Sequence, residues 1–217
     1  MHAYIVFAHP TRRSFTGEVL AELCRGFDDG GHSYEIGDLY EMDFKCEMTP
    51  DEYTREMNVQ GNRPTLPIPP DVEVEHSEIS RADGLAFVFP VWWSDCPAKL
   101  KGWFDRVWVC GYAYEYQFAR ETYPFPRLSI ERALVLCPVG NSLEALKESG
   151  IAKSMRRLYT HDRLRPDAGV KHCEFALLPG MADHFATSSN VARNLEIAYR
   201  YGRNFLMKCT NSEREPH

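Results

Sequence analysis

The sequence predicts an α/β domain built on a parallel β-sheet, because short apolar runs alternate along the chain with segments of helical periodicity. Five apolar runs rich in β-branched and aromatic residues predict strands at residues 3–9, 33–40, 84–90, 132–140 and 173–180. Right-handed crossover connections join parallel strands, and the intervening segments are long enough to form them. A chain of 217 residues accommodates one such domain.

The intervening segments carry helical patterns. An apolar residue recurs at every fourth position from Phe15 to Phe27, which predicts an amphipathic helix that ends at the Gly30–Gly31 pair. The same spacing predicts further helices over residues 98–108, from 142 to about 158, and from about 189 onward.

The number of strands indicates how the sheet is ordered. Five parallel strands suit the flavodoxin-like order 2-1-3-4-5 better than a (β/α)₈ barrel, which needs more chain. We therefore expect a three-layer sandwich formed by residues 1–210. Residues 45–80 are expected to be an irregular surface excursion between strands 2 and 3, because "NRPTLPIPPDVEV" contains four prolines. Residues 211–217, "NSEREPH", are expected to be a disordered tail.

Composition excludes several classes of protein. A net charge of -6 and a pI near 5.8 argue against binding to nucleic acid or to anionic membranes. No apolar run approaches the ~20 residues of a membrane span, and no basic segment precedes the first apolar run. The seven cysteines are scattered without a CxxC pair, which predicts reduced thiols and a cytoplasmic location.

The predicted topology indicates where a ligand should bind. In an open α/β sheet, ligands bind beyond the carboxyl ends of the strands, where the strand order reverses. Here that switch point lies between strands 1 and 3. Three loops meet there: "HPTRRSFTG" (9–17), "PVWWSDCP" (90–97) and "CPVGNS" (137–142).

The first loop predicts a phosphate site. Thr11, Ser14 and Thr16 surround two arginines at the start of a helix, whose free N–H groups favour an anion. The loop lacks the Walker and GxGxxG spacings, so neither a P-loop nor a dinucleotide fold is indicated. Two plainer interpretations remain open: Ser14 simply caps the helix, and His9 is a core histidine.

The second loop predicts a planar ligand. Trp92 and Trp93 lie between Pro90 and Pro97, which together offer flat apolar walls on a stiff backbone. The alternative is that these tryptophans fill an interface. Trp103 and Trp108, which follow in a helix, are interpreted as packing or dimer residues.

Four segments carry a resemblance to a known family: "AHPTRRSF", "DLYEMDF", "FVFPVWWSDCPAKLKGWFDRVWVCGYAYEY" and "YPF". They resemble the NAD(P)H:quinone oxidoreductase family, of the DT-diaphorase and modulator-of-drug-activity type, whose members are flavodoxin-like flavoenzymes. The similarity covers roughly residues 3–140 in the correct order. The central motif P-x-x-W-x-x-x-P-A-x-L-K-G-W-F-D-R-V is long and specific.

The resemblance implies a bound flavin, FAD first and FMN as the second choice. NAD(P)H would be the co-substrate, and a quinone or similar small aromatic acceptor would receive hydride in a ping-pong reaction. It implies that the phosphates and ribityl chain are held by the first loop, through His9, Ser14, Phe15 and Thr16. It implies that the isoalloxazine ring is framed by the second loop, through Pro90, Val91, Trp92 and Trp93. The edge of the ring would be lined by the third loop, through Cys137, Gly140 and Asn141.

The resemblance also implies that Tyr114 and Tyr116 are substrate-pocket tyrosines that act across a homodimer interface; core packing is the alternative. The loop at 137–142 departs from the family pattern. In the family, backbone N–H groups of this loop reach the flavin ring. Pro138 has no N–H to donate, and Val139 stands where a glycine is usual, so only Gly140 and Asn141 keep the role of donating an N–H to the ring.

The family's tyrosine and histidine that assist hydride transfer have no counterparts in "NSLEALKESG". His161 is a candidate substitute proton donor, and a solvated histidine is the alternative. The basic stretch "RRLYTHDRLR" (156–165) is interpreted either as a contact for an NADPH phosphate or as a solvated loop. The pairs His161-Asp162 and His172-Cys173 lack zinc spacing, so no metal site is predicted.

Two other functions stay open. One is a non-catalytic, flavin-binding regulatory subunit of a transport system, a role that some members of this superfamily have. The other is a flavodoxin-like electron carrier, although carriers normally have a strongly acidic docking face and a charge of -6 over 217 residues is modest.

Overall fold

The computed structural model describes residues 1–57, 66–115, 125–164, 169–182 and 186–205. A five-stranded parallel sheet of order β2-β1-β3-β6-β7 forms its centre. Its strands are β1 (His2–Phe7), β2 (Ser33–Asp38), β3 (Gly84–Val88), β6 (Ile130–Pro138) and β7 (Val170–Leu178). Numbered along the chain, these five strands have the order 2-1-3-4-5, as the sequence predicts.

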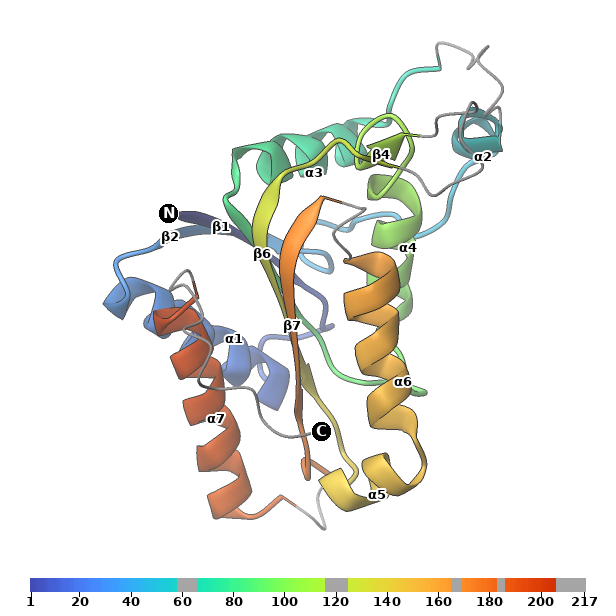
Figure 1. Ribbon diagram of the computed structural model, residues 1–217. Helices are drawn as coiled ribbons and strands as arrows, with labels where there is room; N and C mark the ends of the chain where they lie inside the picture. Colours follow the sequence, from blue (N-terminus) through green and yellow to red (C-terminus); the bar gives the residue numbers. More distant parts are fainter. Residues whose placement is uncertain (58–65, 116–124, 165–168, 183–185, 206–217) are drawn as a thin grey trace.

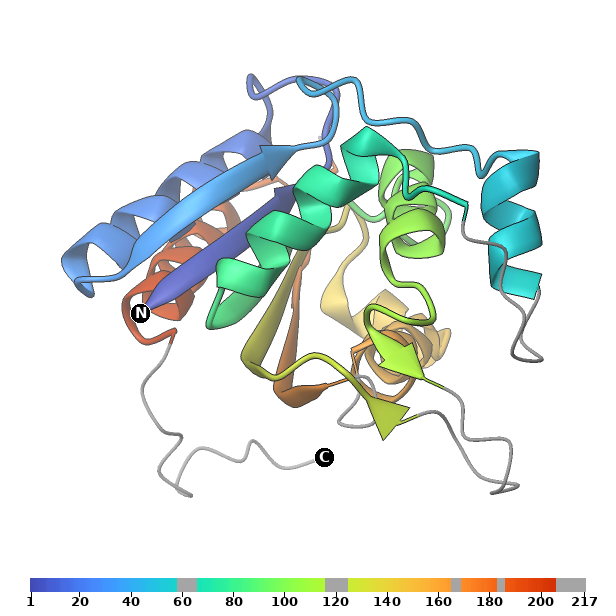
Figure 2. The same cartoon turned by 90° about the horizontal axis from the view of Figure 1, so that it is seen from above.

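Helices cover both faces of the sheet (Figure 1). The helices α1 (Phe15–Asp29) and α7 (Ser188–Arg203) lie on one face, and α3 (Pro70–Arg81), α4 (Ala98–Val107) and α6 (Ile151–Leu158) lie on the other. The short α2 (Pro50–Met57) lies at the periphery, as the view from above shows (Figure 2). The three-layer sandwich is confirmed.

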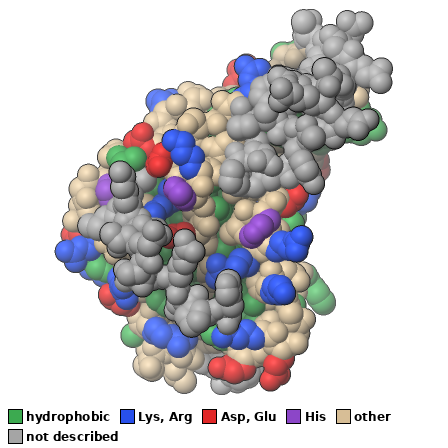
Figure 3. All heavy atoms as spheres, viewed as in Figure 1, with side chains coloured by type: hydrophobic (Ala, Val, Ile, Leu, Met, Phe, Trp, Pro, Cys, Tyr) green, Lys and Arg blue, Asp and Glu red, His purple; other side chains and the backbone are tan. Residues whose placement is uncertain are grey.

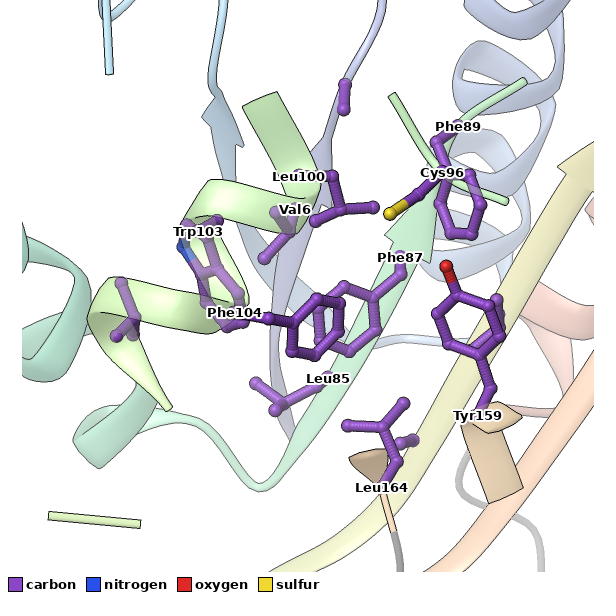
Figure 4. Packing of buried hydrophobic residues seen from close by; sticks show 14 of the residues in the cluster. Val6, Leu85, Phe87, Phe89, Cys96, Leu100, Trp103, Phe104, Tyr159 and Leu164 are labelled. Carbon is purple, nitrogen blue, oxygen red and sulfur yellow. The ribbon is translucent and has the colours of Figure 1, made fainter. Parts of the chain in front are cut away.

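The central strand β3 is buried on both faces, as is usual for parallel sheets. Its alternate side chains enter two separate cores. Leu85 and Phe87 pack toward α4, where Phe87 lies 5.3 Å from Phe104 by ring centroid (Figure 4). Ala86 and Val88 pack toward α1 and α7.

The helices α1 and α7 touch through glycines. A Cβ at Gly26 would lie 2.2 Å from the Tyr199 carbonyl oxygen, and one at Gly202 would lie 2.2 Å from the Leu23 carbonyl oxygen. Glycine is therefore required at both positions for the two backbones to approach. The predicted end of α1 is correct, since Gly30 caps the helix.

The prediction that residues 45–80 form an irregular excursion is wrong. The described parts of this segment contain α2 and most of α3, and Val72 and Ile79 of α3 are fully buried. The prolines misled the prediction because they end where α3 begins. Pro70 occupies the first helical turn, where its missing N–H costs no hydrogen bond.

The single helix predicted from 142 to about 158 is also wrong. It divides into α5 (Leu143–Glu148) and α6, because Gly150 adopts a left-handed conformation with φ 73° between them. A wide π-turn, η1 (Tyr159–Arg163), follows α6. The small antiparallel pair β4 (Tyr114–Glu115) and β5 (Phe125–Pro126) is not among the strands predicted from the sequence. Residues 211–217 lie outside the described residues.

Candidate functional site

The three loops predicted to hold a ligand come together at the carboxyl ends of β1, β3 and β6. The Val91 amide donates to the Pro138 carbonyl oxygen at 2.9 Å, which joins the second loop to the third. The ring centroids of His9 and Trp92 lie 6.0 Å apart, which joins the first loop to the second. The topology thus assembles one site from segments far apart in the sequence.

The first loop uses its hydroxyl groups internally. Ser14 caps α1, because its Oγ accepts from the Gly17 amide at 3.1 Å and donates to the Thr11 carbonyl oxygen at 3.0 Å. Thr16 is buried. The amides of Phe15 and Thr16 have no hydrogen-bond partner among the described residues. These amides, at the positive end of the helix dipole, are the groups available to an anion.

A depression of ≈ 500 Å³ opens beside this loop, between the ends of β1 and β2. Arg12 donates to the buried Asp38 carboxylate at 2.9 Å and to Glu41 at 3.0 Å, so its charge is already balanced. His9 Nδ1 lies 2.7 Å from the Thr11 carbonyl oxygen, and its Nε2 has no partner in the described part of the chain. The depression is lined by His9, Pro10, Thr11, Arg12, Asp38, Tyr40 and Glu41.

The second loop forms a tight two-residue turn. The Trp92 amide donates to the Asp95 carbonyl oxygen at 2.9 Å, and the Asp95 amide donates back at 3.1 Å. Trp93 and Ser94 between them have φ angles of 50° and 63°. Both angles fit a type I′ turn, for which asparagine and glycine are the usual residues. Each left-handed L-residue costs roughly 1–2 kcal/mol, so the turn is strained.

The strained turn presents its aromatic side chains outward. Trp93 is 101% exposed and Trp92 is 42% exposed. Trp103, by contrast, is fully buried, and its Nε1 donates to Glu75 at 2.6 Å. Trp103 is therefore a core residue, as the sequence predicts, whereas Trp92 and Trp93 form an exposed aromatic surface at the switch point.

The carboxylate of Asp95, at the end of this turn, is bound by two side chains of η1. Its Oδ1 accepts from the Tyr159 hydroxyl at 3.0 Å, and the two carboxylate oxygens accept from the two terminal nitrogens of Arg163 at 3.1 Å each. Burial alone would raise the pKa of Asp95, but the bonds from Arg163 and from the Cys96 amide outweigh it, so this pKa is lowered. Asp95 is thus a carboxylate in a bidentate ion pair.

Tyr159 lies in the core beneath the loop. It is fully buried, and Figure 4 shows its hydroxyl directed toward the side of the core that holds Cys96. Burial raises the pKa of Tyr159 and also that of the neighbouring Cys96 thiol. A buried neutral phenol at this place can donate a hydrogen bond to Asp95, but it does not face solvent.

The third loop offers few donors. Cys137 is completely buried, and burial raises its pKa, so its side chain is a core group. The Val139 amide already donates to the Leu178 carbonyl oxygen at 3.0 Å. The amides of Gly140 and Asn141 have no partner in the described ranges. These two amides are the ones free to reach a ligand.

A second, smaller depression of ≈ 170 Å³ borders the exposed turn. Its wall mixes hydroxyl groups with apolar side chains from α6 and from the link between α5 and α6. It is lined by Ser94, Ser149, Ile151, Ser154, Met155 and Leu158.

Of the residues predicted to act on the substrate, the structure describes Tyr114 and His161. Tyr114 lies in β4, whose neighbour Ala113 accepts a backbone bond from Arg127 just before β6 begins. Parallel strands begin at the same edge, so Tyr114 lies at the opposite end of the sheet from the three loops (Figure 1). Tyr116 lies outside the described residues. His161 is exposed, with its Nδ1 2.7 Å from Thr160 Oγ1.

Sequence reasoning missed Asp38, Asp95, Tyr159 and Arg163. Asp38 stands in the quoted segment "DLYEMDF", and a carboxyl at the end of a predicted strand was the available signal. The contact of Asp95 with Arg163 spans 68 positions and left no local signal. Among the described residues, no group of three or more metal-ligating side chains gathers, and no helix is long and apolar enough to cross a membrane.

Comparisons with known proteins agree with this architecture. A family model described as a flavodoxin-like fold matches residues 1–193. A solved NAD(P)H:quinone oxidoreductase from Methanothermobacter marburgensis is 48% identical, covering 94% of this chain and 96% of that one, with a TM-score of 0.85. An uncharacterized NAD(P)H oxidoreductase from Haemophilus influenzae is 29% identical over 178 residues, 82% of this chain and 83% of that protein.

A relative that matches over a shorter stretch is NAD(P)H dehydrogenase [quinone] 1 from Rattus norvegicus, which is 32% identical over 133 residues. The match covers 57% of this chain and 48% of the rat protein, so this chain corresponds to about half of that relative.

The sheet order, the covering helices and a site at the switch point define an α/β protein of flavodoxin-like fold. The chain belongs to the NAD(P)H:quinone oxidoreductase family of oxidoreductases, as the motifs between residues 3 and 140 predict.

Proposed function

We propose that this protein binds a flavin at the switch point and transfers hydride from NAD(P)H to a quinone or a similar small aromatic acceptor. The observation that carries the proposal is the strained turn that exposes Trp92 and Trp93 between two loops with free amides. An exposed aromatic surface next to unpaired donors suits a planar, polar-edged ligand with phosphate groups. The 48% identical relative supports the same reaction class.

The described residues fit such a ligand. The amides of Phe15 and Thr16 bind a phosphate at the start of α1, and the adjacent ≈ 500 Å³ depression accommodates the rest of the nucleotide portion. Because Arg12 is already paired with Asp38, backbone amides and His9, rather than Arg12, hold the phosphate. FAD is the first choice and FMN the second, on the family resemblance alone.

In this proposal the third loop would hold the edge of the flavin ring. There Gly140 and Asn141 donate their amides, while Pro138 has no N–H and the Val139 amide is engaged in the sheet. When bound, the flavin supplies the redox chemistry. The protein contributes by orienting reactants, with Trp92 and Trp93 as the wall. In this proposal NAD(P)H and the acceptor would bind in turn beside Trp92 and Trp93, and ping-pong kinetics would follow.

The substrate side of the site requires a second copy of the chain. Tyr114 lies at the far end of the sheet from its own loops, so it reaches a flavin only in a partner subunit. We therefore propose a homodimer in which Tyr114 and Tyr116 of one subunit border the acceptor bound to the other. His161, which is exposed after α6, remains the candidate proton donor. The six described cysteines are all free thiols, which supports a cytoplasmic location.

Purification decides the cofactor. We expect a yellow protein that releases FAD on denaturation, identified by mass spectrometry, and parallel double-reciprocal plots for NAD(P)H oxidation with a quinone. A colourless protein that binds neither FAD nor FMN would refute the proposal. A flavin-loaded protein without turnover with any acceptor would instead support the regulatory subunit. The electron carrier is disfavoured because a net charge of -6 over 217 residues is modest for a docking carrier. On the one face seen in Figure 3, Lys and Arg side chains lie among Asp and Glu.

A further inference from the structure

The turn that exposes Trp93 needs a restraint from outside. Its two central residues are left-handed, and neither is a glycine. Residues in such conformations persist only when the surrounding structure over-determines them. The side chain of Trp93 is fully exposed, so it cannot supply that restraint itself. The restraint must come from the flanking positions of the turn, Trp92 and Asp95.

Asp95 is the anchored flank. Its carboxylate accepts four hydrogen bonds, from the Cys96 amide, the Tyr159 hydroxyl and two nitrogens of Arg163, at 2.8 to 3.1 Å. Two of the donors belong to η1, more than 60 positions further along the chain. The carboxylate of Asp95 therefore ties the exposed turn to the segment that follows α6.

The donors are themselves fixed. The Arg163 guanidinium lies 4.8 Å from the Tyr159 ring centroid and 5.2 Å from that of Phe104, and its side chain is 11% exposed. The π-turn closes through the Leu164 amide, which donates to the Tyr159 carbonyl oxygen at 2.8 Å. Such turns are rare and concentrate at functional sites. A guanidinium held between two rings is pre-organised to grip a carboxylate.

We propose that Asp95, Tyr159 and Arg163 are positioning residues that hold the Trp92–Asp95 turn in its strained form and thereby set the place of Trp93 at the ligand site. The effect on ligand binding rests on the proposed function, in which Trp93 borders the flavin. The restraint on the turn does not rest on the proposed function, because the restraint concerns the conformation of the turn in the protein without ligand.

The test compares Arg163→Met with Asp162→Asn, a change at the exposed neighbouring position of the same π-turn. The chain is labelled with 5-fluorotryptophan, and the Trp93 signal is assigned by Trp93→Phe in ¹⁹F NMR spectra of the flavin-free protein. We expect Arg163→Met to shift or broaden the Trp93 signal and Asp162→Asn to leave it unchanged. An unchanged Trp93 signal in folded Arg163→Met would overturn the proposal.

A rescue separates positioning from general stability. Glycine adopts a φ of 63° without strain, so Ser94→Gly lets the turn form without its anchor. We expect Arg163→Met to weaken flavin binding about 10-fold, equivalent to ~1.4 kcal/mol. Adding Ser94→Gly is expected to restore flavin affinity and the Trp93 signal, while the melting temperature recovers only in part, because the core contacts of Arg163 are still missing. A double variant that recovers neither would contradict the proposal.

Tyr159→Phe covers the case in which Arg163→Met does not fold. This substitution removes the Tyr159 hydroxyl that donates to Asp95 and keeps the buried ring. We expect it to change the Trp93 signal in the same direction as Arg163→Met, but by less. No change with folded Tyr159→Phe would then count against the proposal. If the wild type binds neither FAD nor FMN, the proposed function fails, but the ¹⁹F comparison still decides whether the turn is held by these residues.

Discussion

The buried side chain of Arg106 allows a stability prediction with a magnitude. Its guanidinium donates to Glu52 at 2.7 Å, to Asp71 at 2.6 and 3.0 Å, and to the Lys45 carbonyl oxygen at 2.6 Å. These four bonds join α4 to the segment that was expected to be irregular. Only 3% of the Arg106 side chain and 2% of the Glu52 side chain are exposed.

Arg106→Met preserves most of the apolar stem but leaves two carboxylates without their cation. Removing one partner of a buried ion pair typically costs about 3–5 kcal/mol. A protein of this size loses roughly 2–4 °C in melting temperature per kcal/mol, so we expect a fall of about 6–20 °C. Urea unfolding followed by circular dichroism measures the free energy, and thermal melts measure the shift.

Lys101→Met is the matched control on the same helix. Lys101 pairs with Asp105 at 2.6 Å, but both side chains are about half exposed, and such pairs contribute about 0–1 kcal/mol. Adding Glu52→Gln to Arg106→Met removes one orphaned charge, so the double variant should recover part of the loss. Equal effects of Arg106→Met and Lys101→Met would refute the reasoning.

The same cluster sets a pH dependence. Burial alone would raise the pKa values of Glu52 and Asp71, but their hydrogen bonds, including those from Arg106, lower them. A lowered folded-state pKa contributes stability above the unfolded value, near ~4, that is lost as the pH falls through the folded value. The difference between the wild type and Arg106→Met should therefore narrow from pH 6 to about pH 3. A constant difference would argue against the ion pair.

Three further predictions concern the cores and the exposed turn. Burial raises the folded-state pKa of Glu75, so the stability that its protonated form contributes is present below the unfolded pKa and is lost as the pH rises. In urea titrations between about pH 4 and 8, the free energy of unfolding of Glu75→Gln should therefore rise relative to that of the wild type. Gly102→Ala places a Cβ 2.2 Å from the Cys46 carbonyl oxygen and should cost about 1–3 kcal/mol, measured by thermal melts. Trp103→Ala should cost about 3–5 kcal/mol, whereas Trp93→Ala should leave stability within about 0.5 kcal/mol and weaken flavin binding in fluorescence titrations.

The sheet could be predicted from the sequence because its signals are local. Each strand is an apolar run, and the buried strand β3 reads as "GLAFV" without interruption. Once five parallel strands are assigned, general topology places the ligand site at the switch point, and the loops at 9–17, 90–97 and 137–142 follow. The quoted motifs then identify the family without any knowledge of contacts.

What could not be predicted depends on distant contacts or on turn geometry. The prolines before α3 read as a break, although Pro69 and Pro70 mark where the helix starts. Tyr159 and Arg163, which bind Asp95, lie more than 60 positions away along the chain, so no local sequence pattern predicts these contacts. Backbone amides such as those of Gly140 and Asn141 are likewise invisible in a sequence, because only the structure tells which are already bonded.

These missed features bear on one another in the proposed site. In the third loop Pro138 has no N–H and the Val139 amide is engaged in the sheet, so a flavin ring bound as proposed would accept fewer hydrogen bonds there. Its position then depends more on the aromatic wall of the second loop. A wall on a strained turn places a ligand accurately only if the turn is rigid, and the carboxylate of Asp95, held by Arg163, supplies that rigidity. Loss of the anchor should therefore harm flavin binding more in this chain than in a relative whose third loop keeps its full set of amides.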